Sequence, residues 1–330
     1  MATTAPLVSI VLGTYNQAPY LGAAIDSALG QTHPNIEVIL VDNGSTDGTA
    51  DVLARYAGVP NLRIQRHARN GAVTKALNQA LDDARGEFVS FLFGDDYYLA
   101  EKIERQLVRF AELPADYGVV YGPGYRLSAR TGQRWLYRGR SPSGWVARDL
   151  LMHFHSASLT PIAPLYRREP LAGTRFHEEI FLEGTESLLL RLSLTCRFSY
   201  LDEPLVVMRD HPGNYGKAYR ANTEFNFFLL DRLREERGYS ADLDPVIVGI
   251  KAVALRSLGW ATLRLTDDVR AARRYLIGAV RIQRRQALHP RTWLGLALAA
   301  LPARIRRALN TIGSRLRRQR SGLEYREDYA

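Results

Sequence analysis

The sequence predicts an α/β fold, with a mostly parallel sheet flanked by helices and a helical C-terminal region. Two observations predict the sheet. Over about the first 95 residues, short apolar runs rich in β-branched residues alternate with amphipathic segments, which is typical of strand–helix repeats. Polar residues follow directly where the apolar runs end. A third observation predicts the helical region, because the apolar spacing beyond residue 221 is almost wholly that of helices.

The expected strands are apolar runs bounded by turn residues, at 7–12, 35–42, 61–67, 88–93 and 117–122. The expected helices have apolar residues every three or four positions, at 18–29, from Asp47 or Thr49 to Tyr56, and at 70–86, 99–112 and 185–194. The stretch 123–180 is expected to be irregular, and 201–216 to form a turn, a strand and a loop.

The composition is that of an ordinary globular protein. The chain has 330 residues, of which 46% are hydrophobic and 24% charged, so one large domain with an appendage, or two domains, is expected. The single cysteine, Cys196, excludes an internal disulfide and a zinc cluster built from cysteines. The first residues lack a basic segment and a long apolar run, so we expect neither a signal peptide nor a membrane span there, and a cytoplasmic protein.

Charge is spread unevenly along the chain. Residues 1–220 carry 23 Lys and Arg and 23 Asp and Glu, whereas residues 221–330 carry 21 and 11 and account for the whole net charge of +10. A neutral body with a basic tail says little about the chemistry of the body and more about what the tail contacts.

Three polar clusters follow predicted strands, namely Thr14-Tyr15-Asn16, Asp42-Asn43 and Asp95-Asp96. Ligands of parallel α/β sheets bind outside the carboxyl ends of the strands. Asp95 and Asp96 are hard oxygen ligands that suit Mg²⁺ or Mn²⁺ together with substrate phosphates. The alternative is that Asp95 begins a turn and Asp96 caps a helix starting near Tyr98.

The other clusters favour a nucleotide. The ring of Tyr15 could stack on a base, Asp42 could accept a hydrogen bond from a base or a sugar, and Lys75 could contact phosphate. Each has a simpler alternative, as a turn residue or part of a solvated helix face. Because the clusters follow successive strands, we favour the functional interpretation of all of them together.

These motifs resemble the nucleotide-sugar-binding half of the family 2 inverting glycosyltransferases, which have the Rossmann-like GT-A fold. The segments that carry the resemblance are VSIVLGTYNQAPYLGAAIDSALGQTHPNIEVILVDNGSTDGT, RNGAVTKALNQAL and GEFVSFLFGDD. It covers about residues 6–112 and continues more loosely through 158–216. The resemblance implies a GT-A domain over 1–220, with a nucleotide-sugar half (1–112) and an acceptor half (113–220), followed by a basic helical region over 221–330.

The resemblance also implies roles for individual residues. The segment after the first strand would line the pocket for the pyrimidine of the donor, Asp42 would bond the base, and Asp95 would approach the ribose. Asn70, Gly71 and Lys75 would lie along the nucleotide and its diphosphate. The whole donor-binding set is Thr14, Tyr15, Asn16, Asp42, Asn70, Gly71, Lys75 and Asp95.

A divalent cation, Mg²⁺ or Mn²⁺, would be held mainly by Asp96, with Asp95 beside it and His211 as a further metal or phosphate contact. The sequence departs from the commonest family pattern at Phe93, where another aspartate usually stands. One direct ligand is thereby lost from the motif.

Transfer also needs a carboxylate that takes the proton from the acceptor hydroxyl. In the family this base is an Asp or Glu just before a helix that reads like LLLRL, and the chain offers Glu186 and Glu183 there. We predict Glu186 as the base and keep Glu183 as the alternative. Either could instead be an acid favoured by the helix dipole.

The basic tail over 291–320 combines a short apolar run with many arginines. Ile305, Leu309, Ile312 and Leu316 follow at helical spacing. A basic amphipathic helix of this kind is typical of one that lies on an anionic membrane. The alternative is a helix packed on the body with a solvated arginine face. Nucleic-acid binding is not expected, because interleaved aromatics and a known module are lacking.

The sequence therefore predicts an inverting glycosyltransferase, cytoplasmic and peripheral to the inner face of the cell membrane. It would use a UDP- or dTDP-type donor and a glycan or lipid-linked acceptor, in synthesis of surface polysaccharide or lipid-linked glycan. The alternatives are a non-catalytic membrane-associated protein that binds nucleotide sugars and a sugar-phosphate nucleotidyltransferase. A dehydrogenase is excluded, because no GxGxxG follows the first strand.

Overall fold

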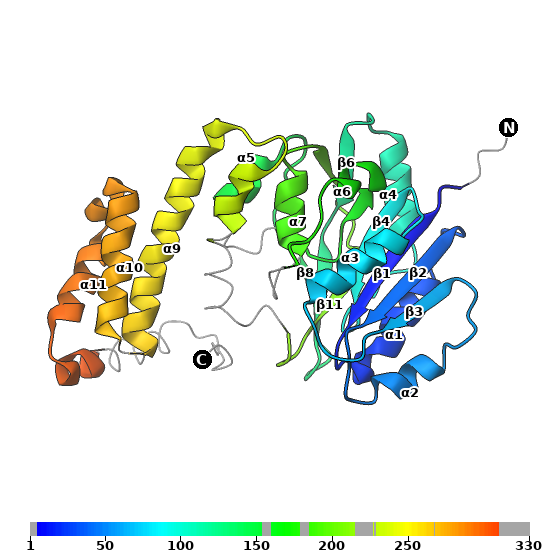
Figure 1. Cartoon of the computed structure of the whole chain (residues 1–330), viewed down its shortest axis with the longest axis horizontal. Coiled ribbons are helices and arrows are strands. Elements are labelled where there is room, and N and C mark those ends of the chain that lie inside the picture. Colours follow the sequence, from blue (N-terminus) through cyan, green and yellow to red (C-terminus); the bar gives the residue numbers. More distant parts are fainter. Residues whose placement is uncertain are drawn as a thin grey trace. The chain divides into compact units, whose positions relative to one another are not determined.

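The computed structural model describes residues 5–153, 160–178, 185–214, 227, 229–266 and 268–309. Contacts within the chain divide it into two units. The first comprises Met1–Asn214 and Asp231–Tyr239, and the second comprises Tyr215–Leu230 and Ser240–Ala330. In Figure 1 the first unit runs mostly from blue to green and the second from yellow to red. The predicted domain boundary at residue 220 stays a prediction.

The first unit is built on a sheet whose described strands have the order β10-β6-β9-β4-β1-β2-β3. These strands are β1 (Val8–Thr14), β2 (Ile36–Asp42), β3 (Leu62–Arg66), β4 (Phe88–Phe93), β6 (Tyr117–Tyr121), β9 (Leu165–Arg167) and β10 (Arg197–Tyr200). All neighbours are parallel except the two pairs that β9 forms with β4 and β6. The prediction of a mostly parallel sheet is confirmed.

Helices flank this sheet, as Figure 1 shows. Every residue of β1 and β2 is buried, as expected for parallel strands with both faces covered. Leu21, Ala24, Ile25 and Ala28 of α1 lie at helical spacing and are fully buried, so the position of this helix follows from the sequence pattern. The helices of this unit are α1 (Ala18–Leu29), α2 (Thr49–Ala54), α3 (Val73–Asp83), α4 (Lys102–Ala111), α5 (Ala147–Met152), α6 (Arg168–Ala172), α7 (Thr185–Leu192) and the 3₁₀ turn η2 (Leu233–Glu235).

A second sheet lies in the same unit, with the order β5-β11-β7-β8. Its strands are β5 (Tyr97–Tyr98), β7 (Gly124–Ser128), β8 (Arg134–Tyr137) and β11 (Val206–Asp210). The prediction that 123–180 is irregular is therefore wrong. Strands β7 and β8 were missed because they are only five and four residues long and mostly half-buried or exposed, so neither forms the buried apolar run by which the other strands were predicted. The alternative in which Asp96 caps a helix starting near Tyr98 is also wrong, because Tyr98 lies in β5 and α4 begins at Lys102.

The second unit is helical, which confirms the prediction for the C-terminal region. Among the described residues, its elements include η3 (Ala241–Leu243), α9 (Asp244–Leu265), α10 (Val269–Ile282), η4 (Arg284–Leu288) and α11 (Pro290–Ala300), and the backbone is also helical over 303–309. Leu276 lies in the core of this unit with Leu263, Ala272 and Ala299. Gly259 lets α9 approach Leu276 closely, since a Cβ there would lie 2.7 Å from Leu276 Cγ.

Among the described helices, one span is long and apolar enough to cross a membrane by length and composition alone. It runs over Ala241–Arg264, with a mean hydropathy of 1.5, and 44% of its most apolar window is buried inside the structure. Core helices of soluble proteins meet the same criteria.

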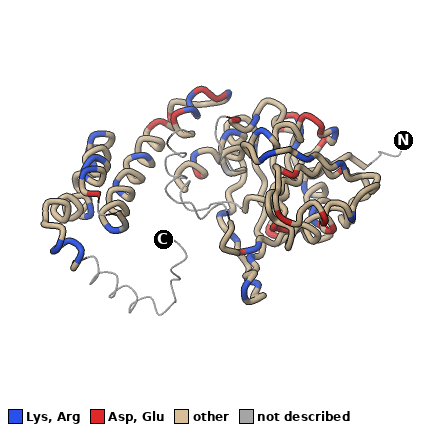
Figure 2. The backbone as a smooth tube through the Cα atoms, turned by 60° about the horizontal axis from the view of Figure 1, so that its bottom comes forward, with Lys and Arg blue, Asp and Glu red and all other residues tan. Residues whose placement is uncertain are grey.

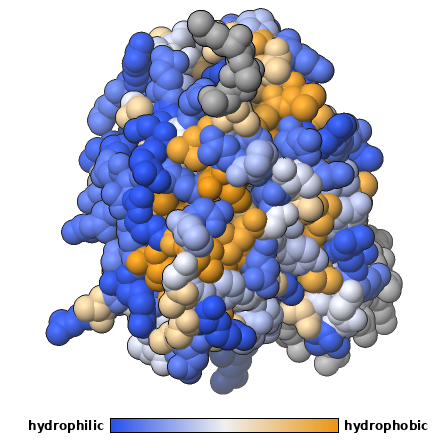
Figure 3. Space-filling model, turned by 90° about the vertical axis from the view of Figure 1, so that its right-hand side faces the viewer, coloured by the Kyte–Doolittle hydropathy of each residue, from blue (hydrophilic) through white to orange (hydrophobic). Residues whose placement is uncertain are grey.

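An apolar hollow of about 450 Å³ lies beside the start of β4. Pro6, Phe88, Leu107, Val108 and Phe110 are among the residues that line it. Because Phe88 begins β4, the hollow lies at the opposite edge of the sheet from the carboxyl ends of the parallel strands. Figure 3 shows a face of the molecule on which apolar surface, in orange, lies between hydrophilic side chains.

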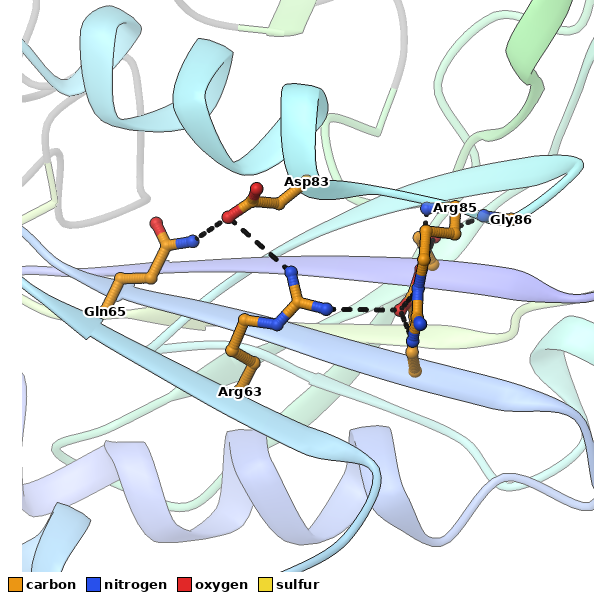
Figure 4. Close-up of polar contacts among 7 residues, drawn as sticks. Arg63, Gln65, Asp83, Arg85 and Gly86 are labelled. Carbon is orange, nitrogen blue, oxygen red and sulfur yellow. Dashed lines mark hydrogen bonds and ion pairs between the residues drawn. The ribbon is translucent and has the colours of Figure 1, made fainter.

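A buried carboxylate joins the starts of β1 and β2 to the chain after α3. Glu37 accepts hydrogen bonds from the Ser9 hydroxyl (2.7 Å), the Arg85 backbone N–H (2.7 Å) and the Arg85 guanidinium (2.8 Å). The Ser9 hydroxyl in turn accepts the N–H of Gly86 at 2.9 Å. Figure 4 shows how Arg63 also reaches into this network, 4.0 Å from Glu37.

We expect Glu37→Gln to lower the free energy of unfolding by about 1–3 kcal/mol near neutral pH, because buried donors lose a charged acceptor. Burial acts to raise the pKa of Glu37, but the hydrogen bonds from Ser9 and Arg85 outweigh it and hold the pKa below its ordinary value. A depressed carboxyl pKa adds stability above the unfolded pKa, which is lost as pH falls through the folded pKa. Urea unfolding from about pH 7 down to about pH 3 should show that the difference in the free energy of unfolding between the wild type and Glu37→Gln shrinks below about pH 4.5. A difference independent of pH would contradict this account.

Candidate active site

Three strand ends meet at one edge of the large sheet. Thr14 pairs with Asp42, and Gly13 pairs with Phe93, both in parallel register. The N–H of Gly94 then donates to the Gly13 carbonyl at 2.9 Å. Neighbouring strands lie about 4.8 Å apart, so the backbones at Asp42 and Gly94 are roughly 10 Å apart. The predicted clusters after β1, β2 and β4 therefore lie together.

The loops after β1 and β2 are tied to each other. The N–H of Asn16 donates to the Ser45 hydroxyl at 2.9 Å, and its Oδ1 accepts the N–H of Thr46 at 2.8 Å. Asn16 has a φ of 52°, in the left-handed region that asparagine tolerates better than most residues. Asp47 accepts the N–H of Ala18 at 3.1 Å. These bonds fix the segment that carries the half-buried Tyr15.

Asp42 is fully buried beneath these loops. Its Oδ1 accepts the N–H of Ser45 at 3.0 Å, and its Oδ2 accepts from Arg66 Nε at 3.2 Å. Asp42 therefore does act as a turn residue, which was the simpler alternative for it. Each carboxylate oxygen can accept more than one hydrogen bond, so the bond to a base stays a prediction. Arg66 was not found from the sequence. It lies opposite Asp42 in the register of β2 and β3, and that position could have indicated it.

Asn43 holds the chain that enters α3. Its Nδ2 donates to the Gly71 carbonyl at 2.8 Å and to Asn70 Oδ1 at 3.1 Å. Asn70 and Gly71 therefore lie next to the end of β2, as their predicted roles need. Lys75 is exposed on the first turn of α3, which begins at Val73.

Asp95 and Asp96 are each only 8% exposed, in the turn after β4. The backbone N–H of Arg209 donates to Asp96 Oδ1 at 2.8 Å. His211 Nε2 lies 3.0 Å from Asp95 Oδ2, and Asn214 Nδ2 donates to the same oxygen at 3.3 Å. The end of β11 and the turn that follows it therefore hold both carboxylates from the second sheet.

The hydrogen bonds of His211 assign its tautomer. Its Nδ1 accepts the N–H of Gly213 at 3.2 Å, so the neutral ring carries its proton on Nε2 and donates to Asp95. In the ranges that the structure describes, no three His, Cys, Asp or Glu side chains are arranged to hold a metal ion. Asp95 and Asp96 offer two carboxylates, which suits Mg²⁺ or Mn²⁺ where phosphates and water complete the shell.

The electrostatics of the pair also fit a cation. Burial raises the pKa of Asp96 well above its ordinary range, and the neighbouring Asp95 charge raises it further. The N–H of Arg209 and the guanidinium groups of Arg126 and Arg209 act in the opposite direction. Two adjacent buried carboxylates repel each other when both are ionised, and a divalent cation between them would remove that repulsion.

Arg209 was not found from the sequence. Its guanidinium lies 5.3 Å from the ring centre of Tyr20 and 5.1 Å from that of Tyr97. Its buried Nε has no hydrogen-bond partner within the part of the chain that the structure describes. An anion beside Asp95 and Asp96, such as a phosphate, would satisfy this donor. The available signal was its position in the RDH segment that contains His211.

A buried lysine supports the segment behind the two carboxylates. Lys102 is fully buried, and its Nζ donates to the Ser90 hydroxyl at 2.8 Å and to Gln106 Oε1 at 2.9 Å. The same Nζ lies 4.3 Å from the ring centre of Tyr98. Burial lowers the pKa of Lys102 well below its ordinary value. These contacts connect β4, β5 and α4 below the turn that carries Asp95 and Asp96.

Comparison with known families identifies the family of this chain. The model of "Glycosyl transferase family 2" matches residues 9–173, which is half of the chain and includes all three strand ends. The chain belongs to glycosyl transferase family 2. Curated relatives agree with this assignment. An uncharacterized glycosyltransferase of Rickettsia bellii is 40% identical over 163 residues, which cover 49% of this chain and 22% of the relative.

A second relative of this family 2 chain is the putative teichuronic acid biosynthesis glycosyltransferase TuaG of Bacillus subtilis. It is 35% identical over 133 residues, which cover 40% of this chain and 52% of TuaG. The aligned part of the family 2 chain thus spans between about a fifth and about half of the length of these two relatives.

Solved structures confirm the predicted GT-A fold of the family 2 chain. Residues 1–349 of S. aureus TarS, crystallised with UDP, superpose with a TM-score of 0.63 at 20% identity, covering 97% of this chain and 93% of that one. The mannosyltransferase PcManGT of Pyrobaculum calidifontis, in complex with GDP-Man and Mn²⁺, gives 0.55 at 18% identity, covering 94% and 88%.

The two candidate bases of this family 2 chain stay predictions. Glu186 lies in the first turn of α7, and the structure describes its backbone but not its side chain. Glu183 lies outside the described residues. Leu188, Leu189 and Leu190 of α7 are buried, so the helix that contains Glu186 and follows Glu183 is anchored in the unit.

Proposed function

We propose that this family 2 protein is an inverting glycosyltransferase that moves a sugar from a nucleoside diphosphate, of UDP or dTDP type, to an acceptor hydroxyl. The observation that carries the proposal is the buried Asp95-Asp96 pair beside the tied loops of β1 and β2. The solved complex of TarS with UDP supports a uridine donor. The name of TuaG supports a role in making a cell-surface polysaccharide.

The donor would lie across the carboxyl edge of the sheet. Thr14, Tyr15 and Asn16 would line the pyrimidine, and Asp42 would accept from the base with the lone pairs that Ser45 and Arg66 leave. Hydrogen-bonding groups at this edge of the sheet would hold the ribose and the diphosphate. They are Asn70, Gly71, Lys75 and Arg209 Nε, which has no hydrogen-bond partner among the described residues, with Asp95 near the ribose.

Mg²⁺ or Mn²⁺ would be held by Asp96, with Asp95 beside it, and the remaining ligand positions would be left to phosphate oxygens and water. When bound, such an ion supplies positive charge that stabilises the leaving nucleoside diphosphate. The complex of PcManGT with Mn²⁺ supports a metal in this fold. His211 would act through its hydrogen bond to Asp95 or contact a phosphate.

Glu186, or Glu183 as the alternative, would take the proton from the acceptor hydroxyl. The acceptor oxygen then forms its bond to the anomeric carbon while the bond from that carbon to the diphosphate oxygen breaks on the opposite face. The electron pair leaves with the nucleoside diphosphate, and the anomeric centre is inverted.

Nucleotide-linked stabilisation tests the donor site. We expect UDP or dTDP with Mn²⁺ to raise the Tm of the full chain, because a ligand at 100 times its Kd adds about 2.7 kcal/mol to the free energy of unfolding. ADP should give a smaller shift, because the pocket is proposed to fit a pyrimidine. Differential scanning fluorimetry of the full chain measures both. No shift with any nucleoside diphosphate, with or without Mn²⁺, would reject the proposed function.

We also propose that the protein lies on the inner face of the cytoplasmic membrane through residues 291–320. In the described part of this segment, Trp293 is 60% exposed, Ile305 49% and Leu309 43%, so apolar side chains face outward. The backbone is helical over 303–309. Exposed apolar residues next to arginines are what an anionic membrane surface binds.

Flotation with vesicles that contain phosphatidylglycerol tests this. We expect Ile305→Glu with Leu309→Glu to lower the bound fraction severalfold, since both side chains would enter the interface. Ile277→Glu with Ile282→Glu is the matched control, because these residues of α10 are 41% and 42% exposed. Equal loss in the two double variants, or none in either, would rule out this segment as the anchor.

A further inference from the structure

We propose that the β7–β8 hairpin, residues 124–140, is the docking surface for an anionic glycan acceptor. Such an acceptor would carry a carboxylate or phosphate on its repeating units. The inference rests on the proposed function and specifies the substrate class that the acceptor side would take.

The charge of the hairpin is the first argument. Residues 124–140 contain five arginines and no Asp or Glu. Arg138 pairs with Asp202, and Arg140 pairs with Asp149 at 2.8 Å. Within the described residues, the other three arginines of the hairpin have no ion-pair partner, and Figure 2 allows the charges to be followed along the backbone. These three are Arg126, Arg130 and Arg134.

The aromatic residues of the hairpin are the second argument. Arg134 lies 4.3 Å from the ring centre of Tyr125, and Arg126 lies 5.2 Å from that of Tyr137. Trp135 is 42% exposed. Guanidinium groups held on aromatic faces present their N–H donors outward, and an exposed indole offers an apolar face on which a sugar ring can pack.

The path from the hairpin to the carboxylates is the third argument. Arg126 is the cross-strand partner of Trp135 on β8 and of Met208 on β11, so these side chains share one face of the sheet. Arg134 pairs with Leu127 and lies on the other face. The next residue of β11, Arg209, donates its N–H to Asp96, and the charge of Arg126 acts on Asp96 as well. A glycan chain on the hairpin would therefore end close to the proposed transfer site.

The edge position of β8 is the fourth argument. Strand β8 ends the order of the second sheet, and its residues 134–136 are exposed. Edge strands expose unpaired backbone groups, and charged residues there hinder pairing with other strands. Within the part of the chain that the structure describes, this hairpin has three arginines without an ion-pair partner together with an exposed tryptophan, which is more than protection of an edge alone explains.

Binding of a labelled oligogalacturonate by the full-length wild type tests the proposal, with a neutral dextran oligosaccharide of similar length as the comparison. Fluorescence anisotropy at low salt should show binding of the uronate and not of dextran. We expect Arg126→Gln with Arg130→Gln to weaken the uronate Kd about tenfold, as loss of two screened charge contacts would do. Trp135→Ala should weaken binding as well, with less dependence on salt.

The matched control is Arg55→Gln with Arg168→Gln, which removes the same charge from exposed positions of the same unit. It should change the uronate Kd less than twofold. Equal weakening in both double variants, or equal binding of dextran, would overturn the proposal. Tighter binding of a single-stranded oligonucleotide or of anionic vesicles through the same arginines would also overturn it, because the surface would then serve another partner.

The wild-type thermal shift with UDP and Mn²⁺ separates this inference from the proposed function. A shift together with unchanged uronate binding in the hairpin variants rejects the anionic acceptor alone. Absence of a shift rejects the proposed function, on which this inference depends. Circular dichroism of each variant shows whether a loss of binding reflects unfolding.

Discussion

Asp96→Asn is expected to reduce sugar transfer by at least about a hundredfold, which is typical when one charged group that stabilises a transition state is removed. Asparagine keeps a carbonyl oxygen in place of Oδ1, so the bond from the Arg209 N–H, 2.8 Å in the wild type, can persist. What is lost is the negative charge that would hold a divalent cation beside the diphosphate. Steady-state assays with a UDP-sugar, with and without Mn²⁺, measure the effect.

The same substitution should leave the Tm unchanged or raise it. The Asp96 carboxylate is buried beside Asp95, and burial raises its pKa, so the folded state gains nothing from its charge. A loss of activity with no loss of stability is the pattern expected where a functional site keeps an unfavourable charge. Asp51→Asn is the matched control, because Asp51 is an exposed carboxylate in the first turn of α2. This control variant should transfer sugar at a rate within twofold of the wild-type rate.

Two outcomes would argue against this assignment. Transfer by Asp96→Asn within a few-fold of the wild type would place the cation, or its substitute, elsewhere. A wild type that is stabilised by UDP and Mn²⁺ but transfers no sugar would favour the non-catalytic alternative, for which Phe93 in place of the usual aspartate is the sequence argument.

Much of the site could be predicted because it depends on local patterns and on one property of parallel sheets. Apolar runs define β1, β2 and β4, and a short polar cluster follows each of them. Once the strands are taken as parallel and adjacent, their carboxyl ends must lie at one edge. The register of Thr14 with Asp42 and of Gly13 with Phe93 bears out this placement.

Local patterns could not predict the residues that support the two carboxylates: Arg209 was not found from the sequence, and His211 was indicated only by the family resemblance. Arg209 lies 113 residues from Asp96 in sequence, and His211 lies 116 from Asp95. They meet because β11 pairs with β5 and β7, and no local pattern specifies such long-range pairing.

Lys102 illustrates a different limit. It lies near the start of an amphipathic helix, where a lysine is normally solvated, yet it is fully buried with Ser90 and Gln106 as acceptors. Burial of such a residue depends on acceptors from another element, and hydrophobic periodicity does not contain that information.

Glu186→Gln is expected to reduce transfer by a factor of about 10²–10⁴, the range for loss of a general base. Its expected effect on nucleotide binding is small, because the base would contact the acceptor hydroxyl and not the diphosphate. The Tm shift with UDP and Mn²⁺ should therefore persist in this variant, whereas Asp96→Asn should lose the part that depends on Mn²⁺. Single-turnover transfer and scanning fluorimetry measure the two quantities separately.

Glu183→Gln is the matched comparison, since it makes the same chemical change three residues earlier. If Glu186 is the base, Glu183→Gln should retain a transfer rate within a few-fold of the wild type and keep the acidic limb of the pH–rate profile. Glu186→Gln should lose this limb, because no carboxylate then titrates in the acceptor step. The reverse pattern would assign the base to Glu183. If both variants keep wild-type transfer and an unchanged acidic limb, neither acid takes the proton, and the base must come from another carboxylate near the Asp95-Asp96 edge.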